Sequence, residues 1–337
     1  MKTLIVSFKV DDTSVYKEKL LDEDVFYYGG ICKLNKQFRI RNVYKVVGFL
    51  VACLYFILNR IICEHNGTDH NSIFSLIRRN KLNEIIIAHI IMAKKINILE
   101  IHWVGYGFLP RRSILEIQKR TNIEIRIINH DWRNFTGGCH VPSDCDMWAK
   151  KCMSCPRTRR NINLSSYYLN NFSNEAELQD VLVSESQKAM LHTIQFPDPE
   201  RFIIEQNRPT DQLEMISKNK RNKGPLLVGF VGVISGNSDN KGLEISVRIC
   251  RELKSSKVMF LGVACSDKLQ VDISFSRLAN KDLQNVFDLL DVLIVPSKLE
   301  TFSMVSHEAI SKGCQVICRG GLAPTTWGST LIASSEI

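Results

Sequence analysis

The chain has 337 residues, of which 45% are hydrophobic and 23% charged, a composition that excludes a disordered polypeptide and favours two globular domains. Its formal net charge of +9 indicates an anionic partner: a nucleic acid, a membrane surface or a phosphorylated small molecule. No recognised nucleic-acid-reading motif accompanies the charge, so we expect no nucleic-acid partner. The eleven cysteines are an odd number, and we expect them to be reduced thiols.

The N-terminal half contains apolar runs that predict buried strands. The opening run ends at Lys9 and Asp11, too early for the core of a signal peptide, and is predicted to be a strand. Further apolar runs cover residues 96–107 and 123–132, and the basic amphipathic segment 111–121 between them predicts a helix.

A basic segment leads into an apolar helix within residues 33–60. Its basic residues are Lys33, Lys36, Arg39, Arg41, Lys45 and Arg60, and it has no acidic residue. Its apolar core covers only residues 46–58, whereas a helix that crosses a bilayer needs about 20 residues. Two interpretations remain open: an interfacial anchor on anionic lipid, and a buried core helix with a solvated basic flank.

The C-terminal half alternates apolar runs with amphipathic segments. The predicted strands are 224–232, 257–264, 291–296 and 314–319. The predicted helices are 242–254, 281–290 and 302–313. Strands that are buried on both faces and alternate with helices predict a parallel, doubly wound sheet. We therefore expect two such domains, residues 1–200 and 224–337, joined by a linker at 201–223.

Polar residues follow several of the predicted strands. His102 and His130 each follow a strand of the first half, while the loop 235–242 and Glu300 each follow a strand of the second half. Open parallel sheets bind ligands beyond the carboxyl ends of their strands, so this placement predicts a binding site. The alternative is that some of these residues are ordinary loop residues.

Two glutamates, Glu300 and Glu308, lie eight positions apart in a segment that otherwise reads as buried. Glu300 is expected in the loop before a helix and Glu308 about two turns into it. The amides of Phe302, Ser303 and Met304 would be unsatisfied donors at the helix N-terminus, where a phosphate fits. The carboxylates would then accept hydrogen bonds from sugar or ribose hydroxyls; the alternative is a helix cap and a solvated glutamate.

The segment "DVLIVPSKLETFSMVSHEAISKG" (291–313) resembles the donor-site signature of glycosyltransferase family 4, retaining nucleotide-sugar transferases of GT-B architecture. The segment "NHDWRNFTGGCH" (129–140) resembles a subgroup of colanic-acid and O-antigen type that builds bacterial surface polysaccharides. The resemblance covers about residues 96–160 and 226–324. It implies an α/β GT-B fold, with two Rossmann-like doubly wound domains facing a cleft, the first on the acceptor side and the second binding the donor.

The resemblance also implies a role for each matching residue. Glu308 would bind the ribose hydroxyls, and Glu300 with the adjoining amides would hold the donor sugar and its phosphate. Lys241 would neutralise the diphosphate, and His130 would lie near the reacting sugar. A lysine and a helix N-terminus can stabilise a departing nucleoside diphosphate without a metal, so we expect no cofactor to be required for catalysis.

The chain departs from the family pattern at several positions. Many relatives have glycine at the position of Ser303, proline at Gln315 and arginine at Gly236. The strands and the helix that usually follow "GGLAPTTWG" are not evident, so we expect a short or incomplete C-terminal domain.

Four cysteines, Cys139, Cys145, Cys152 and Cys155, fall within 17 positions and end in C-x-x-C-P. Their number and type suit a tetrahedral structural zinc, and His140 could replace one thiol. Unligated thiols or disulfides are the alternatives.

The resulting hypothesis is a hexosyltransferase-type retaining enzyme that moves a sugar from a nucleotide-sugar donor to a lipid-linked glycan acceptor. The pathway would be bacterial surface polysaccharide biosynthesis, including O-antigen and other lipopolysaccharide, capsule or exopolysaccharide. The protein would be cytoplasmic and peripheral on the inner face of the cytoplasmic membrane. Two alternatives remain: a nucleotide-sugar epimerase or phosphorylase of similar architecture, and a non-catalytic nucleotide-sugar-binding partner.

Overall fold

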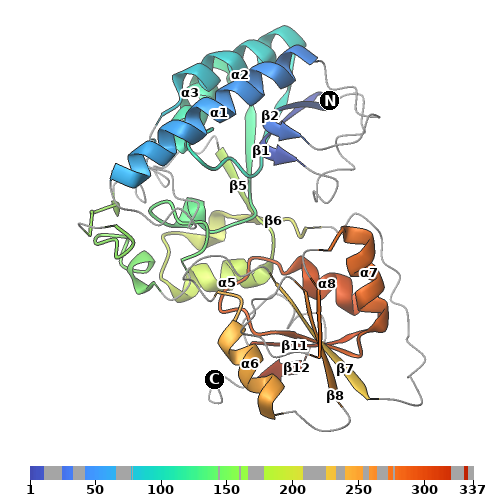
Figure 1. Cartoon of the computed structure of the whole chain (residues 1–337). Coiled ribbons are helices and arrows are strands. Elements are labelled where there is room, and N and C mark those ends of the chain that lie inside the picture. Colours follow the sequence, from blue (N-terminus) through green and yellow to red (C-terminus); the bar gives the residue numbers. More distant parts are fainter. Residues whose placement is uncertain are drawn as a thin grey trace. The chain divides into compact units, whose positions relative to one another are not determined.

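The computed structural model describes residues 1–10, 25–32, 42–65, 77, 79–142, 145–158, 161–165, 178–207, 225–232, 240–252, 258–263, 272–275, 278–319 and 330–332. The chain divides into two compact units, one comprising Met1–Val183 and Leu191–Gln206, the other Ser184–Met190 and Asn207–Ile337 (Figure 1). Most of the predicted linker lies outside the described residues, so the domain boundaries stay predictions.

The first unit is built around a six-stranded sheet in which all neighbouring strands are parallel. In the order β2-β1-β3-β4-β5-β6, its strands are Val25–Cys32, Thr3–Val10, Ile98–Ile101, Glu124–Asn129, Leu178–Leu182 and Ile203–Ile204. The helices are α1 (Asn42–His65), α2 (Lys81–Lys94) and α3 (Arg111–Thr121), with short 3-10 turns at Arg133–Phe135, Asp146–Trp148 and Pro199–Arg201. Helix α5 (Glu185–Thr193) is divided between the two units, since its residues up to Met190 belong to the second and the rest to the first. The helix predicted at 111–121 is confirmed by α3.

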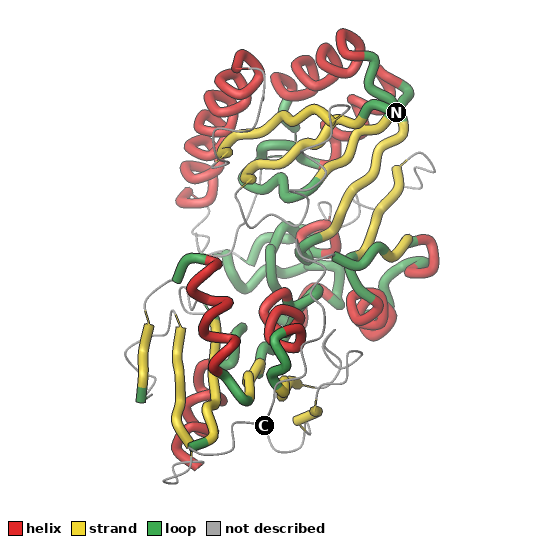
Figure 2. The backbone as a smooth tube through the Cα atoms, turned by 90° about the vertical axis from the view of Figure 1, so that its right-hand side faces the viewer, coloured by secondary structure: helices red, strands yellow, loops and turns green. Residues whose placement is uncertain are grey.

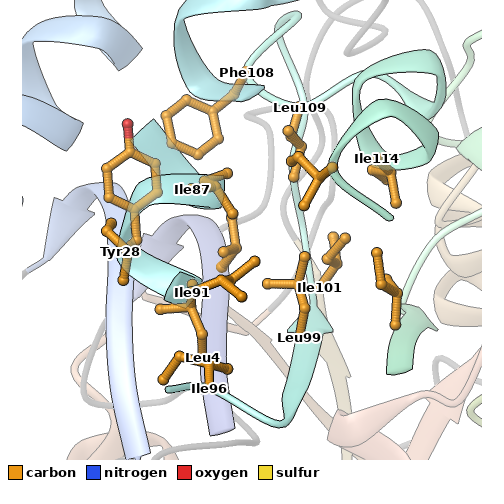
Figure 3. Close-up of a cluster of buried hydrophobic side chains, with 14 of the residues drawn as sticks. Leu4, Tyr28, Ile87, Ile91, Ile96, Leu99, Ile101, Phe108, Leu109 and Ile114 are labelled. Carbon is orange, nitrogen blue, oxygen red and sulfur yellow. The ribbon is translucent and has the colours of Figure 1, made fainter. Parts of the chain in front are cut away.

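The core of this unit lies between its sheet and helices α1, α2 and α3 (Figure 3). Leu4 of β1 and Leu99 of β3 are fully buried, and they belong to the same hydrophobic cluster as Ile87 of α2. All four residues of β3 are buried, as expected for a central strand of a parallel sheet covered on both faces.

The second unit contains another six-stranded parallel sheet (Figure 2). In the order β9-β8-β7-β10-β11-β12, its strands are Ile273–Phe275, Val258–Val263, Leu226–Val231, Val292–Val295, Gln315–Arg319 and Thr330–Ile332. Its helices are α6 (Leu243–Glu252), α7 (Asn280–Leu289) and α8 (Met304–Ser311). The strands and helices predicted for this half are confirmed to within two residues at each end. The strand order matches the 3-2-1-4-5-6 order of dinucleotide-binding sheets.

The apolar helix of the first unit corrects one prediction. The apolar core was expected to be too short to cross a bilayer, but α1 extends over 24 residues, and its segment Val46–His65 is long and apolar enough to do so by length and composition alone. The helix continues past Asn59, where Arg60 and Glu64 form an i,i+4 ion pair on its surface. Only 28% of the apolar window is buried, so the second interpretation, a buried core helix, is also wrong for most of its length.

A buried ion pair joins α3 to the sheet of the first unit. Arg111 Nη1 and Nη2 donate to the two carboxylate oxygens of Asp180 at 2.9 and 2.7 Å. Both side chains are only 7% exposed. Replacing Asp180 would therefore leave a buried guanidinium without its counter-charge.

We predict that Asp180→Ala lowers the free energy of unfolding by about 3–5 kcal/mol, the scale for breaking a buried pair from one side. Asp146→Ala is a matched control, since Asp146 forms an exposed i,i+4 pair with Lys150 and should contribute little. Urea unfolding monitored by circular dichroism measures both. Equal, small changes in the two variants would show that Arg111 is solvated without Asp180.

Candidate functional site

Two loops of the second unit meet where the strand order of its sheet reverses. β7 and β10 lie side by side there, and the chain leaves β7 in one direction across the sheet and β10 in the other. The backbone amide of Lys298, after β10, donates to the carbonyl of Asn240, after β7, at 2.8 Å. Gly242 has φ +73°, and a Cβ there would lie 2.5 Å from the carbonyl oxygen of Pro296. Glycine therefore permits the close approach of the two loops.

The structure brings together two of the predicted site residues, Lys241 and Glu300. Lys241 Nζ lies 2.5 Å from Glu300 Oε1, and the lysine side chain is 38% exposed while the glutamate is 13% exposed. Next to them, Asn240 Nδ2 donates to the carbonyl of Leu299 at 3.3 Å. The Oδ1 of Asn240 is buried, and no group among the described residues donates to it. This corner thus offers a cation, a carboxylate and an amide acceptor.

The three residues predicted to bind phosphate lie at the N-terminus of α8. Ser303 caps the helix with φ +66°, in the left-handed region, and its hydroxyl is 2.7 Å from that of Ser306. This backbone conformation costs a serine about 1–2 kcal/mol and accounts for the glycine that the family 4 pattern has at this position. Phe302 is buried and stacks on the ring of His307 at 6.0 Å, and Met304 begins the helix.

Glu308 lies on α8 and is positioned by a residue of α7. Gln284 Nε2 donates to Glu308 Oε2 at 3.1 Å. The Oε1 of Gln284 is buried and accepts no hydrogen bond from the part of the chain that the structure describes. The amide therefore orients the carboxylate through its one donor contact.

In the first unit, His130 belongs to a chain of polar groups that includes two buried side chains. Glu100 lies within β3, His102 follows β3, and His130 follows the neighbouring strand β4. Glu100 Oε1 is 2.7 Å from His102 Nε2, and His102 Nδ1 is 2.8 Å from His130 Nε2. The side chains of Glu100 and His102 are 4% and 3% exposed.

The order of donors along this chain follows from the carboxylate. Ionised Glu100 can only accept, so His102 must carry a proton on Nε2. If the His102 ring is neutral, its Nδ1 accepts from His130 Nε2–H, which leaves Nδ1 of His130 as the basic nitrogen. Arg126 Nη1 lies 3.7 Å from the second oxygen of Glu100.

The segment 129–140 folds into a compact loop after β4. Asp131 accepts from the backbone and guanidinium of Arg133 at 2.8 and 2.6 Å and contacts His140 Nδ1 at 3.0 Å. Burial opposes ionisation of Asp131, but the charge of Arg133 and the hydrogen bond and charge of His140 together hold its pKa well below the usual range. The Arg133 guanidinium lies 5.4 Å from the centre of the Trp103 ring. Asp131 thus acts as a structural anion that closes the loop.

The four cysteines predicted to bind zinc lie in the same region as free thiols. Burial raises the pKa of Cys139 to about 12 and that of Cys152 to about 11, so both are protonated at neutral pH. The backbone amide of Gly137 donates to Cys152 Sγ at 3.2 Å. No three His, Cys, Asp or Glu side chains within the described ranges are grouped as metal ligands are. The zinc hypothesis for Cys139, Cys145, Cys152 and Cys155 stays a prediction.

Three polar residues of these sites were missed from the sequence. Glu100 had a signal, because a glutamate interrupts an otherwise apolar strand. Asn240 adjoins the predicted lysine, but Gln284 comes from another helix and no sequence pattern relates it to Glu308. Gly236, where the family 4 pattern has arginine, lies outside the described residues. Gln315, where that pattern has proline, begins β11.

No protein-family model matches the chain, and no curated protein sequence matches it. Solved structures do resemble it. WaaG, a glycosyltransferase involved in lipopolysaccharide biosynthesis, aligns over 98% of this chain and 86% of its own with 13% identity and a TM-score of 0.58. HepE from Anabaena, in complex with UDP and glucose, aligns over 99% and 86% with 10% identity and a TM-score of 0.54.

Sucrose-phosphate synthase from Thermosynechococcus elongatus aligns over 98% of this chain and 86% of its own with 11% identity and a TM-score of 0.57. Identities this low establish the fold and nothing finer. Together with the two parallel sheets, these similarities confirm the predicted fold class: the chain has the GT-B fold.

Proposed function

We propose that this protein is a retaining glycosyltransferase of the hexosyltransferase type that transfers a sugar from a nucleotide-sugar donor to a lipid-linked glycan. The observation that carries the proposal is the Lys241–Glu300 pair at the point where the strand order of the second sheet reverses. Ligands of doubly wound sheets bind at such points. The family 4 pattern from Pro296 to Gly313 contains the same glutamate.

The donor would be held by charge and by hydroxyl contacts. A diphosphate near the N-terminus of α8 would accept from backbone amides and attract Lys241, which would exchange its contact with Glu300 for one with phosphate. The released Glu300 carboxylate would accept hydrogen bonds from the sugar. Glu308, oriented by Gln284, would do the same for the ribose. In this proposal lysine and helix stabilise the leaving diphosphate, and no metal ion is required.

Three features support transfer rather than binding alone. Burying Glu100 and His102 costs folding free energy, and both side chains belong to the chain of contacts that includes His130, where the resemblance implies the reacting sugar. The structurally similar HepE was solved with UDP and glucose. The structurally similar WaaG acts in lipopolysaccharide biosynthesis, which supports a surface-glycan acceptor here.

The donor-site roles predict different defects for different variants. Glu308→Ala should weaken nucleotide binding. Glu300→Ala should leave the nucleotide affinity unchanged, because Lys241 loses a competing carboxylate, but it should lower the turnover rate. Lys241→Ala should weaken binding and lower the rate by about 100-fold, the scale for one electrostatic donor. Calorimetric titration with uridine diphosphate and transfer of labelled sugar to a bacterial lipid extract measure the two effects.

Glu252→Ala is the matched control, because Glu252 is an exposed glutamate of the same unit that pairs with Arg248 on α6. A thermal-shift screen of nucleotide sugars would first identify the donor. Nucleotide binding without any transfer would favour a non-catalytic partner, and turnover of the donor without an acceptor would favour an epimerase or phosphorylase. If Glu300→Ala and Glu308→Ala both behave like Glu252→Ala, the proposed donor site is wrong.

The Glu100–His102 chain predicts a positioning role for a residue that touches no substrate. Glu100→Gln should lower kcat by about 100-fold, the scale for a misplaced catalytic group, with the donor KM unchanged. Its pH–rate profile should shift to lower pH, because an amide no longer favours a protonated imidazole. Glu205→Gln is the control, since Glu205 also contacts Arg126 but is half exposed and bonds no described histidine. Identical pH profiles for the two variants would contradict the role.

A further inference from the structure

Helix α1 exposes apolar side chains to solvent, unlike a helix that covers a soluble domain. Such a helix normally buries an apolar stripe and shows polar residues to solvent. The outward ridge of α1 is formed instead by Val46, Leu50, Leu54, Ile57 and Ile61, each 48–60% exposed. Their spacing of three or four residues places them on one line along the helix.

The side of α1 that faces the protein contacts the core through a few residues, and Val47 and Tyr55 are only partly buried there. Val51 and Ala52 are buried in the hydrophobic cluster of the first unit, while Asn59 and Cys63 continue the buried side toward the C-terminus of the helix. The residues with the largest apolar surface therefore lie on the outside. Burying them on folding would have been favourable by roughly 1.5–3 kcal/mol each, so leaving them exposed has a cost that binding could recover.

A second helix of the same hydrophobic cluster repeats the pattern. On α2, Leu82, Ile85 and Met92 are exposed, and their positions fall on one face of the helix. Ile87 and Ile91 of α2 are buried in the cluster that also contains Val51 of α1. Exposed apolar residues on two helices of one layer indicate a surface that a partner covers.

Charge identifies the class of partner. The residues that precede α1 in the sequence include Lys33, Lys36, Arg39 and Arg41, Lys45 lies in its first turn, and no acidic residue occurs from Lys33 to Arg60. A basic stretch of sequence that continues into an apolar helix complements an anionic lipid surface, where headgroup charge and acyl chains are available together. A second copy of this chain would carry the same basic segment.

The fold argues for a helix that lies on the membrane and against one that crosses it. α1 packs along the sheet through Val51 and Ala52, and those residues belong to the core of the first unit. A crossing helix would have to leave that core exposed to water. We propose that the outward ridge of α1, together with the basic residues that precede it in the sequence, docks this protein on anionic membranes by partial insertion into the headgroup region.

This proposal does not depend on the proposed transfer reaction. The full chain is expected to co-sediment with vesicles of 30% phosphatidylglycerol in phosphatidylcholine, and binding should fall as salt is raised. Leu50→Ser combined with Ile57→Ser should weaken binding by at least about tenfold. Leu226→Ser combined with Leu289→Ser is the matched control, because these leucines are equally apolar, 45% exposed and located in the other unit. Circular dichroism and urea unfolding confirm that each variant is folded.

A third variant separates charge from apolar insertion. Changing Lys36, Arg39, Arg41 and Lys45 to glutamine should reduce binding to the anionic vesicles toward the level seen with pure phosphatidylcholine. The proposal would be overturned if the wild-type protein stayed in the supernatant, or if the control pair of variants lost as much vesicle binding as the ridge pair. It would also be overturned if alkaline carbonate failed to extract the bound protein, since the helix would then cross the bilayer. Conversion of a dimer to a monomer by the ridge variant, with vesicle binding unchanged, would assign the ridge to a second copy.

Discussion

Parallel pairing of every strand is the constraint on which the rest of this structure depends. Parallel strands cannot be joined by tight hairpins, so each connection crosses back over the sheet and all strands of a sheet end at the same edge. Where the strand order reverses, the chain leaves two neighbouring strands in opposite directions, and a crevice opens between the loops that follow them. In the second sheet this reversal lies between β7 and β10, and the loops that follow them carry Lys241 and Glu300.

The same constraint explains how the polar groups of the first unit are arranged. Neighbouring strands β3 and β4 end side by side, so residues that follow them come within hydrogen-bonding distance although they are distant in sequence. Glu100 is the exception to an otherwise apolar strand, and its buried carboxylate requires partners. His102 and Arg126 supply them, and the chain of contacts continues to His130. A costly buried carboxylate is thereby used to fix the orientation of an accessible histidine.

The molecule contains two features that cost folding free energy: buried polar groups and exposed apolar side chains. Buried polar groups at strand ends are compensated within the protein by hydrogen bonds and opposite charges. The exposed apolar ridge of α1 has no such compensation among the residues that the structure describes. A surface of this kind is stabilised by what it contacts, and the basic residues that precede it in the sequence favour an anionic lipid surface.

The sequence by itself determined the fold class, most elements of the second unit and some of those of the first, while β2, α2 and β5 were not predicted. Continuous apolar runs identified the central strands, because a strand covered on both faces has no polar side, and the periodicity of residues 111–121 defined α3. The pattern from Pro296 to Gly313 located the candidate donor site, and the glycine-like position at Ser303 has the left-handed backbone that the pattern requires.

Only the tertiary structure decided which distant residues meet and which side of a helix is exposed. The contacts of Gln284 with Glu308 and of His102 with Glu100 and His130 depend on strand order and helix packing, which no local pattern encodes. The composition of α1 is equally compatible with a core helix, a membrane-spanning helix and a surface anchor. Which side is exposed follows from packing, because Val51 and Ala52 lie in the core of the first unit while Leu50 and Ile57 face outward.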